Sequence, residues 1–426
     1  MFGIRDAVRA CLPAGALTLT VVVSLFSSQA SSRENVLYAF CTEKNCADGS
    51  NPSLYGGLII DSAGNLVGTT QNGGAYNAGT VFRIAPGGTE TVLHSFQPCG
   101  CNGSDGMWPM GGVIADSAGN FYGTTWAGGS KGEGSVFKLA PDGTETILYS
   151  FCAQANCSDG ETPWSGLILD SIGNLYGTTL QGGTAGGGTA FRIAPDGTET
   201  VLYNFCTQSQ CTDGESPVAG LILDKQGNLY GTASGGGAVG SCGGGGCGVV
   251  FKIAPNGTET VLHSFCGDCD DGIYPMSSLI MDGSGNLYGA AGFGGTVFKL
   301  APDGTETVLY QFCSVKHCVD GARPMGPLLA DRAGNLYGTT QYGGGTNRHN
   351  RKGVVFKLAP NGVETVLYSF CSQTNCTDGA VPLSGVVMDK AGYLYGTTSL
   401  GGNVRSNGSS FGTVFSVKGP IQLTSH

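Results

Sequence analysis

Charged residues are scarce in this sequence: they make up 12% of its 426 residues, and acidic residues outnumber basic ones by 31 to 21. A chain with a net charge of −10 lacks the basic surface that binds nucleic acid or acidic membranes, so neither is an expected partner. Hydrophobic residues still reach 40%, and glycine supplies 75 residues. This composition indicates a folded, turn-rich chain rather than a disordered one.

A long apolar run of membrane-spanning length is also missing. Leu12–Phe26 is shorter than the about 20 residues that a spanning helix needs. Two arginines precede it and the small residues of Ser28–Ala30 follow it, so residues 1–30 are predicted to be a secretory signal peptide, with an uncleaved anchor as the alternative. Cleavage would remove two arginines and one aspartate, changing the net charge from −10 to −11. It would also remove Cys11 and leave 16 of the 17 cysteines.

One segment, Asp-x-x-Gly-Asn-Leu-Tyr-Gly-Thr-Thr, recurs with variations at a mean period of about 55 residues. Its copies begin at Asp61, Asp116, Asp170, Asp224, Asp282, Asp331 and Asp389. Repeats of this length that contain only strands and turns are typical of β-propeller blades, because the coils of β-solenoids are shorter.

The third repeat shows the four strands of a blade, here named A to D. They are predicted at Leu167–Leu169, Leu175–Thr178, Thr189–Ile193 and Thr200–Tyr203. The A–B and C–D turns contain the Asp, Asn, Gly and Pro residues of tight hairpins and leave no room for a helix.

One repeat is divided between the two ends of the chain. Glu34–Phe40 has the pattern of a lone strand D, whereas Val386–Asp389, Tyr393–Thr398 and Gly412–Val417 have the patterns of strands A, B and C. If the first segment pairs beside Val414–Ser416, the ring is closed by hydrogen bonds and no strand edge is left open. An open solenoid does not need a repeat divided between its two ends, so this division favours a closed ring.

We therefore predict an all-β protein. Residues 31–419 would form one seven-bladed propeller with four antiparallel strands in each blade, and its ring would be closed by the N-terminal strand. Residues 420–426 would be a C-terminal tail. We expect a monomer.

These repeats resemble the GloVer tandem-repeat proteins, an exported choice-of-anchor family, and more distantly the NHL-type propellers with their Asp-x-x-Gly-Asn-Ile-Tyr turn. The resemblance covers residues 36 to 418. It implies a secreted or cell-surface repeat protein and no particular activity or functional residues. The residues after Val417 include no apolar anchor or basic sorting tail, so free secretion or a periplasmic location is the expectation.

Most cysteines occur in pairs separated by four residues, mainly in the loops that follow strand D. Local disulfides are predicted for Cys41/Cys46, Cys152/Cys157, Cys206/Cys211, Cys242/Cys247, Cys313/Cys318 and Cys371/Cys376, for the closer pair Cys266/Cys269, and with an uncertain partner for Cys99 and Cys101. Zinc is the weaker alternative, because the five histidines show no matching spacing.

The D–A and B–C loops, which share one face of a propeller, vary between repeats, whereas the A–B and C–D turns hardly change. A rigid scaffold with variable loops is how binding faces are built, so any ligand is expected on the D–A/B–C face. Trp108, Trp126 and Trp164 lie in neighbouring loops of this face and are candidates to stack against a sugar or a protein; filling gaps under the loops is the alternative.

Each D–A loop ends in Asp-Gly-x-x-Pro, which could form an acidic ring at the channel mouth but fits a structural turn better. The denser cluster of Asp268, Asp270 and Asp271 is a hypothetical calcium site; no other cofactor is expected. Arg348, His349, Arg351 and Lys352 form the one basic cluster, where a solvated loop is the default and an acidic glycan or phosphate could dock.

Catalytic signatures are poor. Gly128–Gly132 and Gly235–Gly240 match a nucleophile elbow and a dinucleotide fingerprint, but neither lies between a strand and a helix. The first functional expectation is thus a secreted or envelope propeller that binds a glycan or an extracellular protein without catalysis. A metal-dependent lactonase or lyase at the channel mouth, and a structural matrix or envelope protein, are the alternatives.

Overall fold

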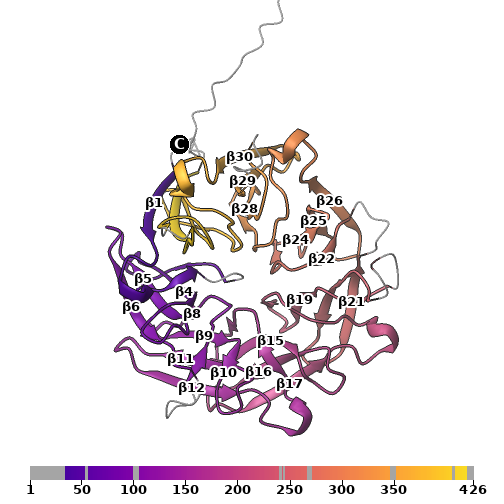
Figure 1. The fold of residues 1–426 in the computed structure, drawn as a ribbon. Coiled ribbons are helices and arrows are strands. Elements are labelled where there is room, and N and C mark those ends of the chain that lie inside the picture. The colour runs from indigo at the N-terminus through magenta and orange to yellow at the C-terminus, as the bar shows by residue number, and fades with distance from the viewer. Residues whose placement is uncertain are drawn as a thin grey trace, which may run out of the picture. The chain divides into compact units, whose positions relative to one another are not determined.

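Seven antiparallel sheets follow one another around a central axis in the unit formed by Ser32–His426 (Figure 1). The structure is a computed structural model that describes residues 34–52, 56–98, 105–238, 242, 245–265, 271–345, 352–404 and 408–419. The predicted signal peptide and C-terminal tail lie outside these residues. The prediction of an all-β, seven-bladed propeller is confirmed.

Each blade has the predicted strands, with strand A reduced to two residues next to the axis. Strand A is β3 (Ile59–Ile60), β8 (Ile114–Ala115), β14 (Ile168–Leu169), β18 (Ile222–Leu223), β23 (Ile280–Met281), β27 (Leu329–Ala330) and β31 (Val387–Met388). Strand B is β4 (Leu66–Asn72), β9 (Phe121–Thr125), β15 (Leu175–Gln181), β19 (Leu229–Ala233), β24 (Leu287–Phe293), β28 (Leu336–Thr340) and β32 (Tyr393–Thr398).

The two outer strands are equally regular. Strand C is β5 (Thr80–Ile84), β11 (Ser135–Leu139), β16 (Thr189–Ile193), β20 (Val249–Ile253), β25 (Thr296–Leu300), β29 (Val354–Leu358) and β33 (Thr413–Lys418). Strand D is β6 (Glu90–Ser95), β12 (Glu145–Ser150), β17 (Glu199–Asn204), β21 (Glu259–Ser264), β26 (Glu306–Gln311), β30 (Glu364–Ser369) and β1 (Glu34–Ala39).

The ring closes where β1 adds to the last blade. β1 pairs antiparallel with β33, with Val36 opposite Phe415, and the Phe40 amide donates to the Gly412 carbonyl at 3.1 Å. Figure 1 shows β1 lying against the yellow strands that come from the other end of the chain. The predicted closure by the N-terminal strand is therefore confirmed.

The core between strands depends on a glycine and a phenylalanine that face each other in every blade. In blade 2, Gly123 of β9 lies opposite Phe137 of β11, and a Cβ on this glycine would lie 2.6 Å from the Phe137 ring. The phenylalanines of strand C are fully buried. Only glycine leaves room for the ring at this position, which explains the repeated Tyr-Gly-Thr-Thr segment.

The threonines of the same segment join blades together. Thr69 donates its hydroxyl hydrogen to the Gly111 carbonyl of the next blade at 2.8 Å, and Thr124 donates to Ser165 at 2.7 Å. Both threonines are at most 3% exposed. Although strand threonines could have lined the channel, these side chains lie between blades.

Candidate functional site

On the D–A/B–C face, further backbone hydrogen bonds join the D–A loops to the B–C side of the blades; we call this layer the loop tier. Short strands in the Asp-Gly-x-x-Pro segments pair with the beginning of the B–C loops. These strands are β2 (Ser50–Pro52), β7 (Gly106–Met107), β13 (Glu161–Pro163) and β22 (Ile273–Pro275), and β7 pairs with β10 (Ala127–Gly128). In these four blades, backbone pairing therefore joins the described part of the D–A loop to the B–C side of the blade.

Within this tier, the residue before each proline has a left-handed backbone in all seven blades. In blade 2 it is Trp108, whose φ is +57°. Its amide donates to the Ala78 carbonyl of the preceding blade at 2.8 Å, and its carbonyl accepts the Trp126 amide at 3.0 Å. The seven residues are Asn51, Trp108, Thr162, Ser216, Tyr274, Arg323 and Val381, with φ between 53° and 58°. We call them the pre-proline ring.

A left-handed conformation costs a non-glycine residue about 1–2 kcal/mol, so a purely structural turn would favour glycine or asparagine here. The pre-proline ring instead holds seven different side chains on one backbone geometry. Thr162 and Val381 are buried, whereas the other five side chains are partly exposed, so a fixed backbone presents varied groups for recognition at these five positions.

The two tryptophans of blade 2 lie together on this scaffold. The Trp108 and Trp126 rings are 5.6 Å apart between centroids and inclined by 37°. Trp164 directly follows β13, in the D–A loop of blade 3. All three side chains are half-buried, so each ring keeps part of its surface open to solvent.

A second aromatic group, missed by the sequence analysis, occupies blades 5 and 6. The Arg323 guanidinium lies 4.4 Å from the Phe293 ring centroid and 5.4 Å from that of Tyr342. Tyr274 meets Phe293 edge to face at 5.6 Å. Aligning the repeats on the residue before proline would have found Tyr274 and Arg323, because Trp108 occupies the same position.

The Asp-Gly-x-x-Pro aspartates do not form an open acidic ring. Asp48 is fully buried and accepts the hydroxyl hydrogen of Tyr38 and the amide hydrogen of Thr42, both at 2.8 Å. Asp159 and Asp378 have the same partners in their own loops. These carboxylates hold the D–A loop to strand D, which agrees with the structural interpretation of the motif.

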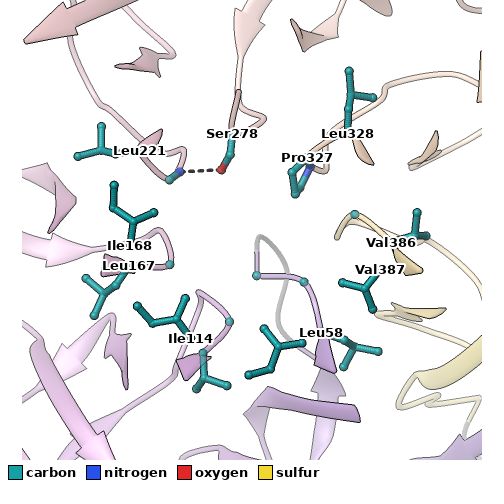
Figure 2. A pocket seen from close by; sticks show the side chains of 18 residues that line it. Leu58, Ile114, Leu167, Ile168, Leu221, Ser278, Pro327, Leu328, Val386 and Val387 are labelled. Atoms are coloured by element: carbon teal, nitrogen blue, oxygen red, sulfur yellow. Dashed lines mark hydrogen bonds between the residues drawn. The ribbon is translucent and has the colours of Figure 1, made fainter. Parts of the chain in front are cut away.

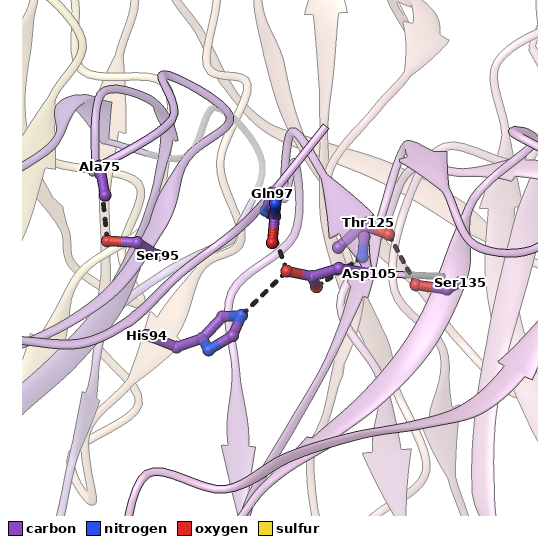
Figure 3. Close-up of polar contacts among 8 residues, drawn as sticks. Ala75, His94, Ser95, Gln97, Asp105, Thr125 and Ser135 are labelled. Atoms are coloured by element: carbon purple, nitrogen blue, oxygen red, sulfur yellow. Dashed lines mark hydrogen bonds and ion pairs between the residues drawn. The ribbon is translucent and has the colours of Figure 1, made fainter. Parts of the chain in front are cut away.

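His94 and His263 replace the tyrosine of strand D and contact the corresponding aspartates. Figure 3 shows the His94 imidazole facing Asp105, with Nε2 at 3.4 Å from the carboxylate, and His263 lies 3.2 Å from Asp271. Each imidazole also packs edge to face on the next phenylalanine, Phe96 or Phe265. Each histidine thus lies between an aspartate and a phenylalanine.

A glutamate begins every strand D and lies near the aspartate loop of the neighbouring blade. Burial, together with the nearby Asp48 carboxylate, raises the pKa of Glu90 to about 7. Glu145 shifts in the same way near Asp105, and burial together with Asp378 raises the pKa of Glu34 to about 8. In all seven glutamates Oε1 is buried without a hydrogen-bond partner in the described part of the chain. The interfaces between blades therefore favour protonated glutamates.

The A–B turn aspartates are structural, as expected. The Asp116 carboxylate accepts hydrogen bonds from the amides of Ala118 and Asn120, from the Asn120 side chain and from the Tyr122 hydroxyl. Burial opposes ionisation, but these hydrogen bonds prevail and lower the pKa of Asp116 below its usual value. This turn therefore offers no spare carboxylate oxygen to a ligand.

The central channel holds a cavity of about 280 Å³ with an apolar lining. Figure 2 shows Leu58, Ile114 and Val386 around it, and the Ser278 hydroxyl accepts the Gly220 amide at 2.9 Å. Glycines at the start of strand A bring the backbones of neighbouring blades together; a Cβ on Gly111 would lie 2.6 Å from the Gly166 nitrogen. The described lining contains no histidine and no acid, so it offers no set of metal ligands or proton donors.

Two larger cavities, of about 380 and 390 Å³, lie between blades on the side of the A–B and C–D turns. Ile60 of blade 1 borders both, and the rest of their linings combines residues of the A–B and C–D turns with residues of the adjoining strands. We interpret them as gaps between wedge-shaped neighbouring blades rather than as a selective site.

Six of the predicted disulfides are formed: Cys41–Cys46, Cys152–Cys157, Cys206–Cys211, Cys242–Cys247, Cys313–Cys318 and Cys371–Cys376. Five of them close a D–A loop around a short 3₁₀ turn, as in η1 (Lys44–Cys46), η2 (Ala155–Cys157), η3 (Ser209–Cys211), η4 (Lys316–Cys318) and η6 (Thr374–Cys376). Glu161 lies near one pair, but bonded sulfurs are not available to bind a metal.

Several predicted site residues fall outside the described part of the chain. They are Cys99, Cys101, Cys266, Cys269, Asp268, Asp270, Arg348, His349 and Arg351. Of the hypothetical calcium ligands, Asp271 is described and contacts His263. In the described residues, no helix is both long and apolar enough for a membrane span.

Fold and site together define a seven-bladed propeller with unlike side chains at equivalent positions of its loop face. The model of the Gloeobacter/Verrucomicrobia repeat matches residues 54–294 and 241–415, so the chain belongs to this family, as its resemblance to the GloVer proteins implied. No curated protein matches the sequence.

Solved structures share the fold. Virginiamycin B lyase from Staphylococcus aureus is 13% identical, with a TM-score of 0.55 over 90% of this chain and 98% of that chain. The extracellular domain of a putative one component system from B. thetaiotaomicron is 14% identical, with a TM-score of 0.54 over 92% of this chain and 43% of that chain. At such identities the similarity shows the fold alone.

Proposed function

We propose that this propeller is a non-catalytic glycan-binding protein that holds its ligand on the D–A/B–C face. The observation that supports this most is the pre-proline ring, where seven unlike side chains share one strained backbone geometry. Trp108 and Trp126 supply adjacent, partly open rings of the kind on which sugar rings stack. An extracellular protein that inserts an apolar residue there is the alternative ligand.

A lyase or lactonase is the competing function, because a solved propeller of the same fold is a virginiamycin B lyase. It would require a metal or an acid and base near the channel mouth. The described channel lining is aliphatic, with glycines, Pro327 and Ser278, and the aspartates of the loops are hydrogen-bonded within their own loops. We therefore favour binding over catalysis.

We also propose that the protein works outside the cytoplasm as a secreted or periplasmic monomer. Six local disulfides require an oxidising compartment to form and persist. The structurally similar domain from B. thetaiotaomicron is described as extracellular, which supports the same location.

The test is glycan-array binding of the purified protein and of the double variant Trp108→Ala/Trp126→Ala. The variant should lose at least about tenfold in affinity, since stacked aromatic contacts are worth about 1–3 kcal/mol each. Ile172→Ala, which removes an exposed apolar side chain (76% exposed) from the opposite face, is the matched control. Equal array binding by the tryptophan double variant and the wild type would refute the proposal.

A further inference from the structure

The second aromatic group on the loop face combines stacking surfaces with a positive charge that has no acidic partner among the described residues. It consists of Tyr274, Phe293, Arg323 and Tyr342, here called the Arg323 cluster, and it spans the boundary between blades 5 and 6. The Phe293 and Tyr342 rings are 37% and 38% exposed, which is high for large hydrophobic side chains in this structure. Solvent therefore reaches both residues that contact the guanidinium.

The B–C loop of blade 5, next to this boundary, is short. Only Gly294 and Gly295 connect β24 to β25 in blade 5, whereas seven residues connect β4 to β5 in blade 1. The B–C loop of blade 5 is therefore too short to extend over the neighbouring rim at Arg323. Phe293 lies at the tip of this shortened hairpin and faces the neighbouring blade.

Backbone contacts fix the position of Arg323. Its φ is +58°, as in the rest of the pre-proline ring, and its carbonyl accepts the Gln341 amide at 2.9 Å. Ala322, one residue earlier, forms a bridge with Tyr342, which sets that ring beside the guanidinium. The cluster is thus assembled before any ligand arrives.

Arg323 has no acidic partner among the described residues: the ion pairs found there are those of His94 and His263. The other described arginines and lysines also form no ion pair, so Arg323 is distinguished by its position against two aromatic rings. Its planar group stacks on aromatic rings and still presents several N–H donors, which match a carboxylate in a two-point contact. The two rings provide flat apolar surfaces of the kind that pack against the faces of sugar rings.

We propose that the Arg323 cluster binds a carboxylated sugar, that is, a uronic acid residue of an acidic polysaccharide. This rests on the proposed glycan-binding function and extends it to a second site on the same face. Arg323 would pair with the carboxylate while Phe293 and Tyr342 contact the ring. The net negative charge of the protein gives no long-range attraction to a polyanion, so recognition depends on this local pairing. The competing interpretation is that Arg323 only packs the boundary between blades.

The test is calorimetric titration of the full protein with trigalacturonic acid and with its fully methyl-esterified form. The ester keeps the sugar rings and removes the charge. The acid should bind at least about tenfold more tightly than the ester, as expected for loss of a charge-assisted pair. Arg323→Gln should remove this difference, and Arg323→Lys should restore it only in part because it lacks the planar fork.

Arg332→Gln is the matched control, because it removes one exposed arginine from the A–B turn of the same blade on the opposite face. Tyr342→Ala supplies a second variant with an unchanged charge; it should weaken binding of acid and ester alike. Equal affinity for acid and ester, or an acid preference that survives Arg323→Gln in a variant of unchanged melting temperature, would overturn the inference.

Failure of this inference is distinguishable from failure of the proposed function. If neutral glycans bind in a manner that depends on Trp108, and the acid is not preferred over its ester, only the Arg323 site is refuted. If no glycan binds, both the Arg323 site and the proposed glycan-binding function are refuted.

Discussion

The ring of Phe40 lies edge to face on that of Phe82, with centroids 5.0 Å apart. Phe40 directly follows the N-terminal strand that completes blade 7, whereas Phe82 belongs to strand C of blade 1. The same contact recurs between Phe370 and Phe415 and between Phe96 and Phe137. The closing boundary is therefore built like the other boundaries between blades.

Replacing Phe40 with alanine should destabilise the whole ring. The side chain is fully buried, so its loss should reduce the free energy of unfolding by about 3–5 kcal/mol. Denaturant unfolding followed by circular dichroism measures this. Phe293→Ala, at a 37% exposed position, should cost far less. Equal effects of the two substitutions would mean that the closing boundary contributes no special stability.

The glycine of Tyr-Gly-Thr-Thr should not tolerate a methyl group. In Gly123→Ala the new Cβ would lie 2.6 Å from the Phe137 ring, and the resulting overpacking should cost about 1–3 kcal/mol. Gly87→Ala is the matched control, because a Cβ there meets no atom within 4 Å. Thermal melting of both variants checks the prediction. An unchanged melting temperature for Gly123→Ala would show that the sheet adjusts without strain.

Stability should fall as the pH rises from about 4.5 to about 7. The pKa of Glu90 is raised from 4.5 to about 7, so the folded state binds more protons than the unfolded state in this window, and deprotonation favours unfolding. The A–B turn aspartates act oppositely: their lowered pKa values mean that stability is lost as the pH falls below 3.8. Maximum stability is therefore expected between about pH 4 and pH 5.

Thermal melting at pH 5 and pH 8 measures this pH effect, and a melting temperature about 5 °C or more higher at pH 5 is expected. The triple variant Glu90→Gln/Glu145→Gln/Glu199→Gln should narrow the gap by gaining stability at pH 8. Glu215→Gln, which alters a loop glutamate outside strand D, should leave it unchanged. A protein that is more stable at pH 8 than at pH 5 would contradict the account.

The local disulfides should stiffen loops without holding the ring together. Closing a loop of this length contributes about 2 kcal/mol in the chain-entropy model, so Cys152→Ser/Cys157→Ser should lose about that amount and still fold into the propeller. Denaturant unfolding and proteolysis of the loop check the two parts of this prediction. Loss of the folded ring in the double variant would show that the bridge does more than stiffen its loop.

The architecture was predictable because the same pattern of strands and turns occurs in seven copies along the sequence. Strands B and C of the seventh repeat were placed to within one residue of β32 and β33, and the division of the last blade predicted the pairing of Glu34–Ala39. Strand A was predicted too long, since Leu167 lines the channel and lies just before β14. Short strands next to the axis have few ladder bonds, and sequence patterns cannot define their ends.

The candidate site was less predictable, because its residues are brought together by contacts with residues of other blades. The tryptophans were conspicuous by type, whereas Arg323 becomes notable only when Phe293 of the preceding blade stacks on it. The glutamates of strand D show no distinguishing pattern within one repeat, because the Asp48 carboxylate that helps to raise the pKa of Glu90 lies in the loop after strand D of another blade. Contacts across a blade boundary leave no periodic signal in one repeat.

The central claim, that the ligand occupies the D–A/B–C face, is tested most directly by blocking each face in turn. Tyr76→Cys places a thiol at a 52% exposed position two residues from Ala78, whose carbonyl binds the Trp108 amide; Ile172→Cys places one at a 76% exposed position in an A–B turn. Each variant is coupled to a maleimide-linked polyethylene glycol and applied to a glycan array. We expect coupling at position 76 to abolish binding and coupling at position 172 to leave it intact; the reverse pattern would contradict the account.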